Sequence, residues 1–192
     1  MKSVAWLFPV IFMLHEMEEI IGLRIWLDKN TDIINKYNKF SAVYKNYSNE
    51  GFSTAVLEEY LLCIIITIAS IYFRTYIVWL GAFIAFSLHL FFHIIQSIII
   101  KRYIPALSTS IILLPISLVL INTVIYNAKY SIFSITISSI FCLILMMLNL
   151  KFVHKLMDKV TEIVSEAPAL ALFFYPIPRP KPQYMSHIFC FR

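Results

Sequence analysis

Charged residues and glycine are both scarce in this sequence. Of its 192 residues, 14% are charged, only 3 are glycine, and 60% are hydrophobic. Ordinary soluble domains are about 25% charged and roughly 45–50% apolar, so a soluble fold of this composition would leave large apolar patches facing water. The composition therefore excludes a typical soluble enzyme and a disordered chain. It predicts an integral membrane protein built from helices, because outer-membrane barrels need alternating polar and apolar residues.

Cysteine is also rare, and the three cysteines, Cys63, Cys142 and Cys190, lie far apart. No pair has CxxC spacing, so neither a disulfide framework nor a thiolate metal site is expected. The net charge of +5 comes from Lys and Arg residues at the ends of apolar runs. That placement is typical of membrane spans rather than of a nucleic-acid surface, so we expect the lipid bilayer, and no nucleic acid, as a partner.

Five apolar segments are long enough to cross a bilayer, which takes roughly 20 helical residues. Backbone groups in lipid must be paired within the segment, so these spans are expected to be helices. No small-residue cleavage site follows the first segment, which we therefore expect to be retained. The sequence predicts an all-α, polytopic transmembrane bundle with spans at about 3–27, 53–73, 76–100, 105–126 and 130–150.

Beyond a transmembrane domain over 1–150, the chain changes character twice. Residues 151–167 have an amphipathic pattern, typical of an extension of the last span or of a helix lying on the membrane. Residues 168–192 are rich in proline and are expected to form a disordered tail. Between the first two spans, the polar stretch 28–52 predicts a loop with room for a short surface helix near 33–47.

The basic residues also predict an orientation. Before the tail, ten Lys and Arg residues fall on one side of the predicted spans and three on the other. The positive-inside rule then puts the N-terminus outside and the C-terminus in the cytoplasm of a multi-pass cell-membrane protein.

Ionisable residues inside the predicted spans are the most unusual feature. Each charge near the middle of a membrane costs about 2.5–3.5 kcal/mol on insertion scales, so these side chains need partners, protonation or a metal. They include five of the eleven acids and three of the five histidines: Glu16, Glu18, Glu19, Glu58, Glu59, His15, His89 and His93.

Helical geometry predicts that most of these groups meet. At about 1.5 Å per residue, Glu19, Glu59 and His93 lie at similar depths, about 9–12 Å from the expected cytoplasmic ends of their helices. His15 and His89 lie about one turn deeper. Residues three and four apart share a helix face, which brings Glu18 and Glu19 to the side of His15. Glu16 points about 100° away and is expected to serve another contact.

Histidine and carboxylate ligands suit a divalent Zn, Fe or Mn ion, and helical bundles build such sites from facing helices. A hydrogen-bonded proton relay without metal is the alternative. Glu18 and Glu59 are the candidate general bases, with Glu59 preferred over Glu58, although acids in a first helical turn also favour the helix dipole. The predicted metal ligands are His15, Glu18, Glu19, His89 and His93.

A short motif adds a resemblance. His15-Glu16-Met17-Glu18-Glu19 fits H-x-x-E-E, and a later histidine, His89 or His93, precedes Tyr103-Ile104-Pro105-Ala106. Together they resemble the HXXEE-domain family of small bacterial membrane proteins, whose function is uncharacterised, over about 14–106. Ala106 stands where that family usually has glycine. The resemblance implies a multi-span membrane protein and marks His15, Glu18 and Glu19, without implying a reaction.

Three functions fit these observations. The first is a metal-dependent enzyme acting on an apolar or lipid-like substrate within the bilayer. The second is a proton- or metal-coupled transporter that uses the same side chains. The third is a structural subunit whose polar cluster joins helices. The sequence leaves the oligomeric state open.

Overall fold

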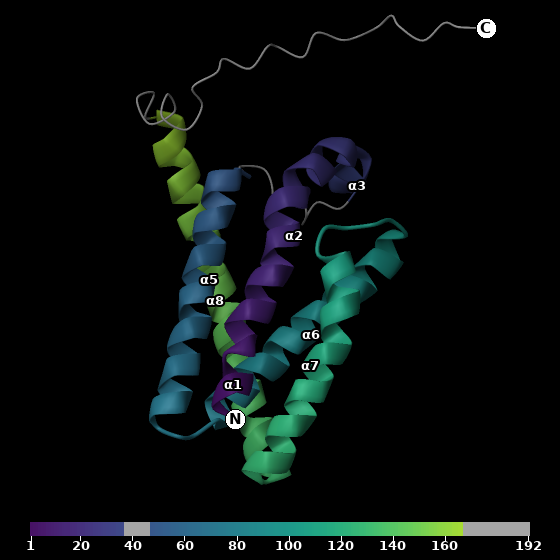
Figure 1. The fold of residues 1–192 in the computed structure, drawn as a ribbon. Helices are drawn as coiled ribbons and strands as arrows, with labels where there is room; N and C mark the ends of the chain where they lie inside the picture. The colour runs from purple at the N-terminus through teal and green to yellow at the C-terminus, as the bar shows by residue number, and fades with distance from the viewer. Residues whose placement is uncertain (37–46, 167–192) are drawn as a thin grey trace, which may run out of the picture.

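The computed structural model describes residues 1–36 and 47–166, which form helices and no strand. Their order along the chain is α1 (Lys2–Ala5), α2 (Leu7–Lys29), α3 (Thr31–Lys36), α5 (Asn49–Tyr72), α6 (Ile77–Ile100), α7 (Leu107–Ala128) and α8 (Ile132–Glu166). The N-terminus lies at one end of the bundle and the end of α8 at the other (Figure 1). The predicted all-α bundle is confirmed, whereas the proline-rich tail and most of the expected surface helix lie outside the described residues.

Four of the described helices, α5, α6, α7 and α8, are long and apolar enough to cross a membrane. Helix α2 has 23 residues and runs alongside them (Figure 1), but three glutamates interrupt its apolar sequence. Its length of about 35 Å, at 1.5 Å per residue, is close to that of α5, α6 and α7. We therefore treat α2 as a fifth member of the bundle, with its polar groups turned toward the other helices.

Helix starts depend on capping groups that the apolar runs do not mark. Helix α5 begins at Asn49, where the Ser48 side chain accepts a hydrogen bond from the Gly51 N–H at 3.0 Å. The expectation of a start near Ser53 is therefore wrong, because Ser48 satisfies a first-turn donor four to five residues earlier. Helix α8 is continuous, so residues 151–166 extend the last span.

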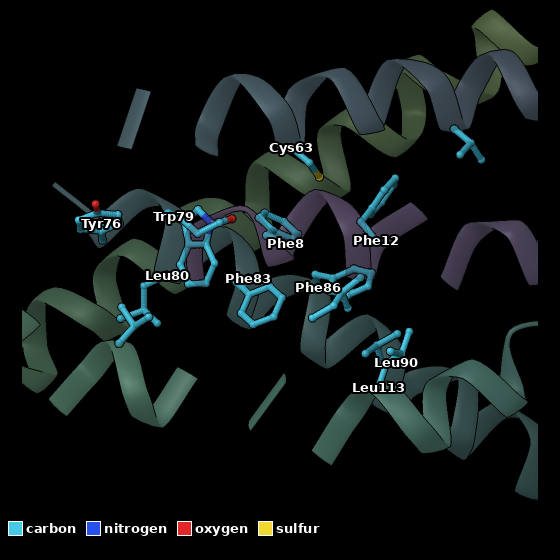
Figure 2. Close-up of a cluster of buried hydrophobic side chains, with 14 residues drawn as sticks. Phe8, Phe12, Cys63, Tyr76, Trp79, Leu80, Phe83, Phe86, Leu90 and Leu113 are labelled. Carbon is cyan, nitrogen blue, oxygen red and sulfur yellow. The ribbon is translucent and has the colours of Figure 1, made fainter. Parts of the chain in front are cut away.

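An aromatic row joins α2 to α6. Phe8 packs edge-on against Phe83 with ring centroids 5.1 Å apart, and Trp79 lies 4.9 Å from Phe83. The Trp79 indole donates to the Ala5 carbonyl at 3.1 Å, which satisfies its one polar atom. Figure 2 shows these rings between the two helices. They determine which face of α2 turns toward α6, and Phe86, the next ring along, lies 5.7 Å from the His15 ring.

Glycines mark the points where helices approach most closely. A Cβ added at Gly81 of α6 would lie 2.6 Å from the Ser138 hydroxyl of α8 and 2.7 Å from its carbonyl oxygen. A Cβ added at Gly51 of α5 would lie 2.6 Å from the carbonyl oxygen of Met157. Small residues let backbones pack this closely in membrane bundles, so α8 is held against both α5 and α6.

Candidate metal site

Three imidazoles from two helices meet in the bundle. His89 and His93 lie one turn apart on α6, with their Nε2 atoms 2.9 Å apart. The ring of His15, on α2, lies 5.4 Å from that of His89 and 5.1 Å from that of His93. One ligand nitrogen from each of the three lies within 4.8 Å of the other two. The sequence-based expectation that α2 and α6 bring their histidines together therefore matches the structure.

The spacing of these nitrogens fits a single metal ion. Zinc binds histidine nitrogen at about 2.0–2.1 Å, so two nitrogens on one tetrahedral ion lie about 3.3 Å apart. The Nε2 atoms of His89 and His93 lie 2.9 Å apart, and one nitrogen of each of the three histidines lies within 4.8 Å of the other two, so small side-chain movements would bring all three onto one ion. His15 Nε2 and His93 Nδ1 are buried without a hydrogen-bond partner. Buried polar atoms without partners are rare, so these two free nitrogens are a second indication that the site accommodates a ligand such as a metal ion.

Glu19 lies beside the histidines. Its Oε1 is 3.5 Å from His93 Nε2, close enough to complete a set of three nitrogens and one carboxylate. Glu19 interacts electrostatically with Glu59 of α5 and with Glu16. No Lys or Arg forms an ion pair with these acids in the described parts of the chain. The polar cluster thus continues from the imidazoles of α6, through Glu19, to α5.

The structure distinguishes the two adjacent glutamates of α5. Glu58 accepts a hydrogen bond from the Asn149 amide of α8 at 3.0 Å. Glu59 also lies near that amide, but it interacts in addition with the acids of α2. Because α5 begins at Asn49, both glutamates lie about 14–15 Å inside the helix at 1.5 Å per residue. The simpler explanation, that they sit in a first turn and favour the helix dipole, is therefore wrong.

Glu18 is directed toward α7 rather than toward the imidazoles. Its carboxylate accepts hydrogen bonds from the N–H groups of Ser108 and Thr109 at 3.2 and 2.7 Å, and from the Thr109 hydroxyl at 2.6 Å. The Tyr103 hydroxyl is a fourth donor. These groups form the first turn of α7 and the loop before it, so Glu18 caps a neighbouring helix. Its predicted roles as ligand and general base stay predictions, with no supporting contact.

The loop before α7 explains the Tyr-x-Pro motif. The Leu107 N–H donates to the Ile104 carbonyl at 3.2 Å, and Ala106 has φ 78° and ψ −12°. This is the geometry of a type II turn, with proline second and a left-handed residue third. Glycine adopts that conformation without strain, which is why its replacement by Ala106 is unusual.

Partial burial and the hydrogen bond to Glu18 both raise the pKa of Tyr103.

Two residues of the site were missed by sequence reasoning. Thr109 contacts both His15 and Glu18, although more than 90 positions separate it from them, and nothing in its local sequence marks it. Glu16, expected to serve another contact, is only 5% exposed and belongs to the acid cluster with Glu19 and Glu59. The sequence did not define the rotation of α2 about its own axis well enough to place Glu16 in that cluster.

These features define a class of protein, a helical membrane bundle with histidines and carboxylates gathered between its spans. The chain matches the family described as "Protein of unknown function with HXXEE motif" over residues 6–120, and it belongs to that family. The matched region is wider than the expected 14–106 and includes α2, α3, α5, α6 and α7 as far as Leu120. No curated protein and no solved structure matches the chain.

Proposed function

We propose that this protein is an intramembrane metalloenzyme that binds one divalent ion through His15, His89 and His93, with the Glu19 carboxylate beside the ion and the fourth position open. The observation that supports this most strongly is the convergence of three imidazoles from two helices, one of which has a fully buried Nε2 without a partner. Zn, Fe and Mn are the candidate metals, because all three accept histidine and carboxylate ligands. A cation would also offset the buried acids beside the site.

The residues suit catalysis more than a purely structural metal. Catalytic zinc sites typically use three protein ligands and keep one position open, whereas structural sites are closed by four. A divalent ion held there would supply Lewis-acid activation of a carbonyl or phosphoryl oxygen. Glu59 is the better candidate for the general base, because it faces the cluster from α5 and is not one of the proposed metal ligands. Glu18 is already occupied by four donors at α7.

The surroundings favour an apolar or lipid-like substrate. His89 is half-buried on α6, and its neighbours Leu88 and Phe92 are 39% and 60% exposed. In a membrane those exposed side chains would contact lipid tails. A substrate could then reach the imidazoles sideways from the bilayer.

Metal analysis tests this proposal. The detergent-purified chain should hold about one ion, and His15→Ala or His93→Ala should each lower the content below about a tenth of that, since removing one of three ligands opens the site. His154→Ala is the matched control, because His154 bonds only the Leu150 carbonyl of its own helix α8 among the described contacts. A wild-type content below about a tenth of an ion per chain would refute the proposal.

The enzymatic part needs a separate measurement. A Co²⁺-substituted protein with an open position should change its visible spectrum when an alkyl hydroxamate is added, because the hydroxamate oxygens would bind the metal. An unchanged spectrum would indicate a closed, structural site and would argue against catalysis.

A second candidate, a proton-coupled transporter, draws support from the row of acids formed by the buried Glu16 and the half-buried Glu19 and Glu59 across α2 and α5. Such rows serve as proton relays in membrane proteins. Proton flux in liposomes that disappears in Glu19→Gln, with no bound metal, would favour this function over the enzyme.

We also propose the orientation predicted from the basic residues, with the N-terminus outside and the C-terminus in the cytoplasm. An odd number of crossings, α2 included, agrees with the opposite positions of the N-terminus and the end of α8 (Figure 1). This orientation is tested with reporters fused after α8. A reporter that works only in the cytoplasm should be active, and activity only from a reporter that works outside the cell would reverse the orientation.

A further inference from the structure

We propose that Glu18 and Thr109 are positioning residues that hold His15 in the tautomer with its proton on Nδ1 and a free lone pair on Nε2. The use of that lone pair as a metal ligand rests on the proposed function. The tautomer itself is a property of the metal-free protein and is tested without metal.

A chain of hydrogen bonds carries this inference. His15 Nδ1 lies 3.0 Å from the Thr109 hydroxyl, which lies 2.6 Å from Glu18 Oε2. The Ala106 carbonyl lies 3.2 Å from the same hydroxyl. The Thr109 oxygen therefore has three neighbours, two of which can only accept its proton.

The direction of each bond follows from the donors around Glu18. The backbone N–H groups of Ser108 and Thr109 can only donate, and one of them bonds each oxygen of the carboxylate. Glu18 is therefore an acceptor, and the 2.6 Å separation lies in the range of a hydroxyl bonded to a charged carboxylate. A hydroxyl has one proton. With that proton directed at Glu18, Thr109 offers only lone pairs to His15, so His15 Nδ1 must donate.

The other ring nitrogen then carries the lone pair. His15 is fully buried, and its Nε2 has no hydrogen-bond partner. One ring nitrogen of His15 lies within 4.8 Å of a nitrogen of each of His89 and His93, and Nε2 is the nitrogen that Thr109 leaves free for them. Metal-ligating histidines usually donate their second ring N–H to a nearby acceptor, which fixes the tautomer and the ring orientation. Here the acceptor is a hydroxyl held in place by a carboxylate.

This arrangement also accounts for the spacing of the motif. His15, Glu18 and Glu19 share one side of α2, because residues three and four apart lie on the same helix face. Glu19 reaches back to His93 of α6, while Glu18 reaches α7. The motif thus has three roles. His15 supplies an imidazole, Glu19 lies beside the α6 histidines, and Glu18 holds Thr109, the residue that orients His15.

Variants of Thr109 separate orientation of His15 from capping of α7. Thr109→Val keeps the backbone N–H that bonds Glu18 and removes only the hydroxyl, whereas Thr109→Ser retains the hydroxyl. Thr123→Val is the matched control on the same helix, since the Thr123 hydroxyl bonds only the Val119 carbonyl among the described contacts. It lies about 21 Å further along the helix, at 1.5 Å per residue.

The first measurement is the ¹⁵N spectrum of histidine-labelled, metal-free protein in micelles at a pH where the histidines are neutral, with the His15 signals assigned by their loss in His15→Ala. Wild type, Thr109→Ser and Thr123→Val should show Nδ1 protonated and Nε2 unprotonated for His15. Thr109→Val should lose this preference. A proton on Nε2 in wild type, or an unchanged tautomer in Thr109→Val, would overturn the inference.

The second measurement is Co²⁺ affinity. Loss of an outer hydrogen bond typically weakens metal binding 10–100-fold, so Thr109→Val should fall in that range while Thr109→Ser and Thr123→Val stay near wild type. Equal affinity in Thr109→Val and wild type would refute the positioning role even though the metal site stands. If wild type has the predicted tautomer but binds no Co²⁺, the metal proposal fails and the tautomer assignment is supported.

Discussion

Replacing Gly81 by alanine is a direct test of the packing that holds α6, and with it two of the three histidines. The new methyl group would lie 2.6 Å from the Ser138 hydroxyl, 2.7 Å from its carbonyl oxygen and 2.8 Å from its carbonyl carbon. Ordinary contacts are about 3.5–4.0 Å, so α6 and α8 would have to separate by about 1 Å. The backbone of α8, rather than a movable side chain, blocks the way.

The expected change combines two destabilising contributions and one stabilising contribution. Overpacking a tight interface typically costs about 1–3 kcal/mol, and separation also weakens the 2.8 Å bond from the Ser138 hydroxyl to the Ile77 carbonyl, about 0.5–1.5 kcal/mol. Alanine gains about 0.5–1 kcal/mol over glycine from helix propensity. We therefore expect Gly81→Ala to lower the free energy of unfolding by about 1–3 kcal/mol.

The assay is reversible unfolding in mixed micelles, followed by circular dichroism. Gly22→Ala is the matched comparison, since its methyl would meet only the Pro105 ring at 3.3 Å and gains the same propensity. Gly81→Ala/Ser138→Ala should not recover stability, because the carbonyl oxygen remains in the way. If Gly81→Ala were as stable as Gly22→Ala, the close approach of α6 and α8 would be refuted.

Three further predictions concern the ends of α6 and α7. Glu18→Ala should lower the unfolding free energy by about 1–3 kcal/mol, because the first-turn N–H groups of α7 lose a charged acceptor, and Glu18→Gln should recover part of it; equal losses would contradict this. Ala106→Val should lower the melting temperature, since a β-branched residue resists φ 78°, whereas Ala106→Gly should not lower it, since glycine adopts that conformation without strain; equal effects would argue against the turn. The hydrogen bond from Arg102 lowers the pKa of Asp32, so its small stabilisation is present above the ordinary value of 3.8 and is lost as the pH falls through the lowered value. NMR titration of Arg102→Gln should return the pKa of Asp32 toward 3.8 and thereby remove this dependence; an unmoved pKa would disprove it.

The helices were predictable where apolar runs end at polar residues. The span expected at 76–100 is Ile77–Ile100, because Lys101 ends the run. The start of α5 was missed because Asn49, Glu50 and Gly51 look like loop residues. Contacts with α8 make them helical, including the 2.6 Å bond between the hydroxyls of Ser48 and Thr161. No local pattern contains that information, since 113 positions separate the two residues.

The sequence predicted how deep the site residues lie in the membrane, but it did not predict which neighbouring helix each side chain faces. The constant rise of a helix was enough to bring His15, Glu19, His89 and His93 to neighbouring levels. Glu18 and Glu19, however, both lie on the side of α2 that carries His15, at i+3 and i+4. Which of the two faces the α6 histidines depends on how α2 is rotated, and the packing of Phe8 against Phe83 sets that rotation.

The sequence alone determined that this chain is a membrane bundle with ionisable groups in its interior, because hydropathy and helix rise are local properties of consecutive residues. Only the tertiary structure decided which acids accompany the imidazoles. Glu19 lies against α6, while Glu18 caps α7 and, through Thr109, reaches back to His15. These partners lie more than 70 residues apart, and only the packing of whole helices brings them into contact.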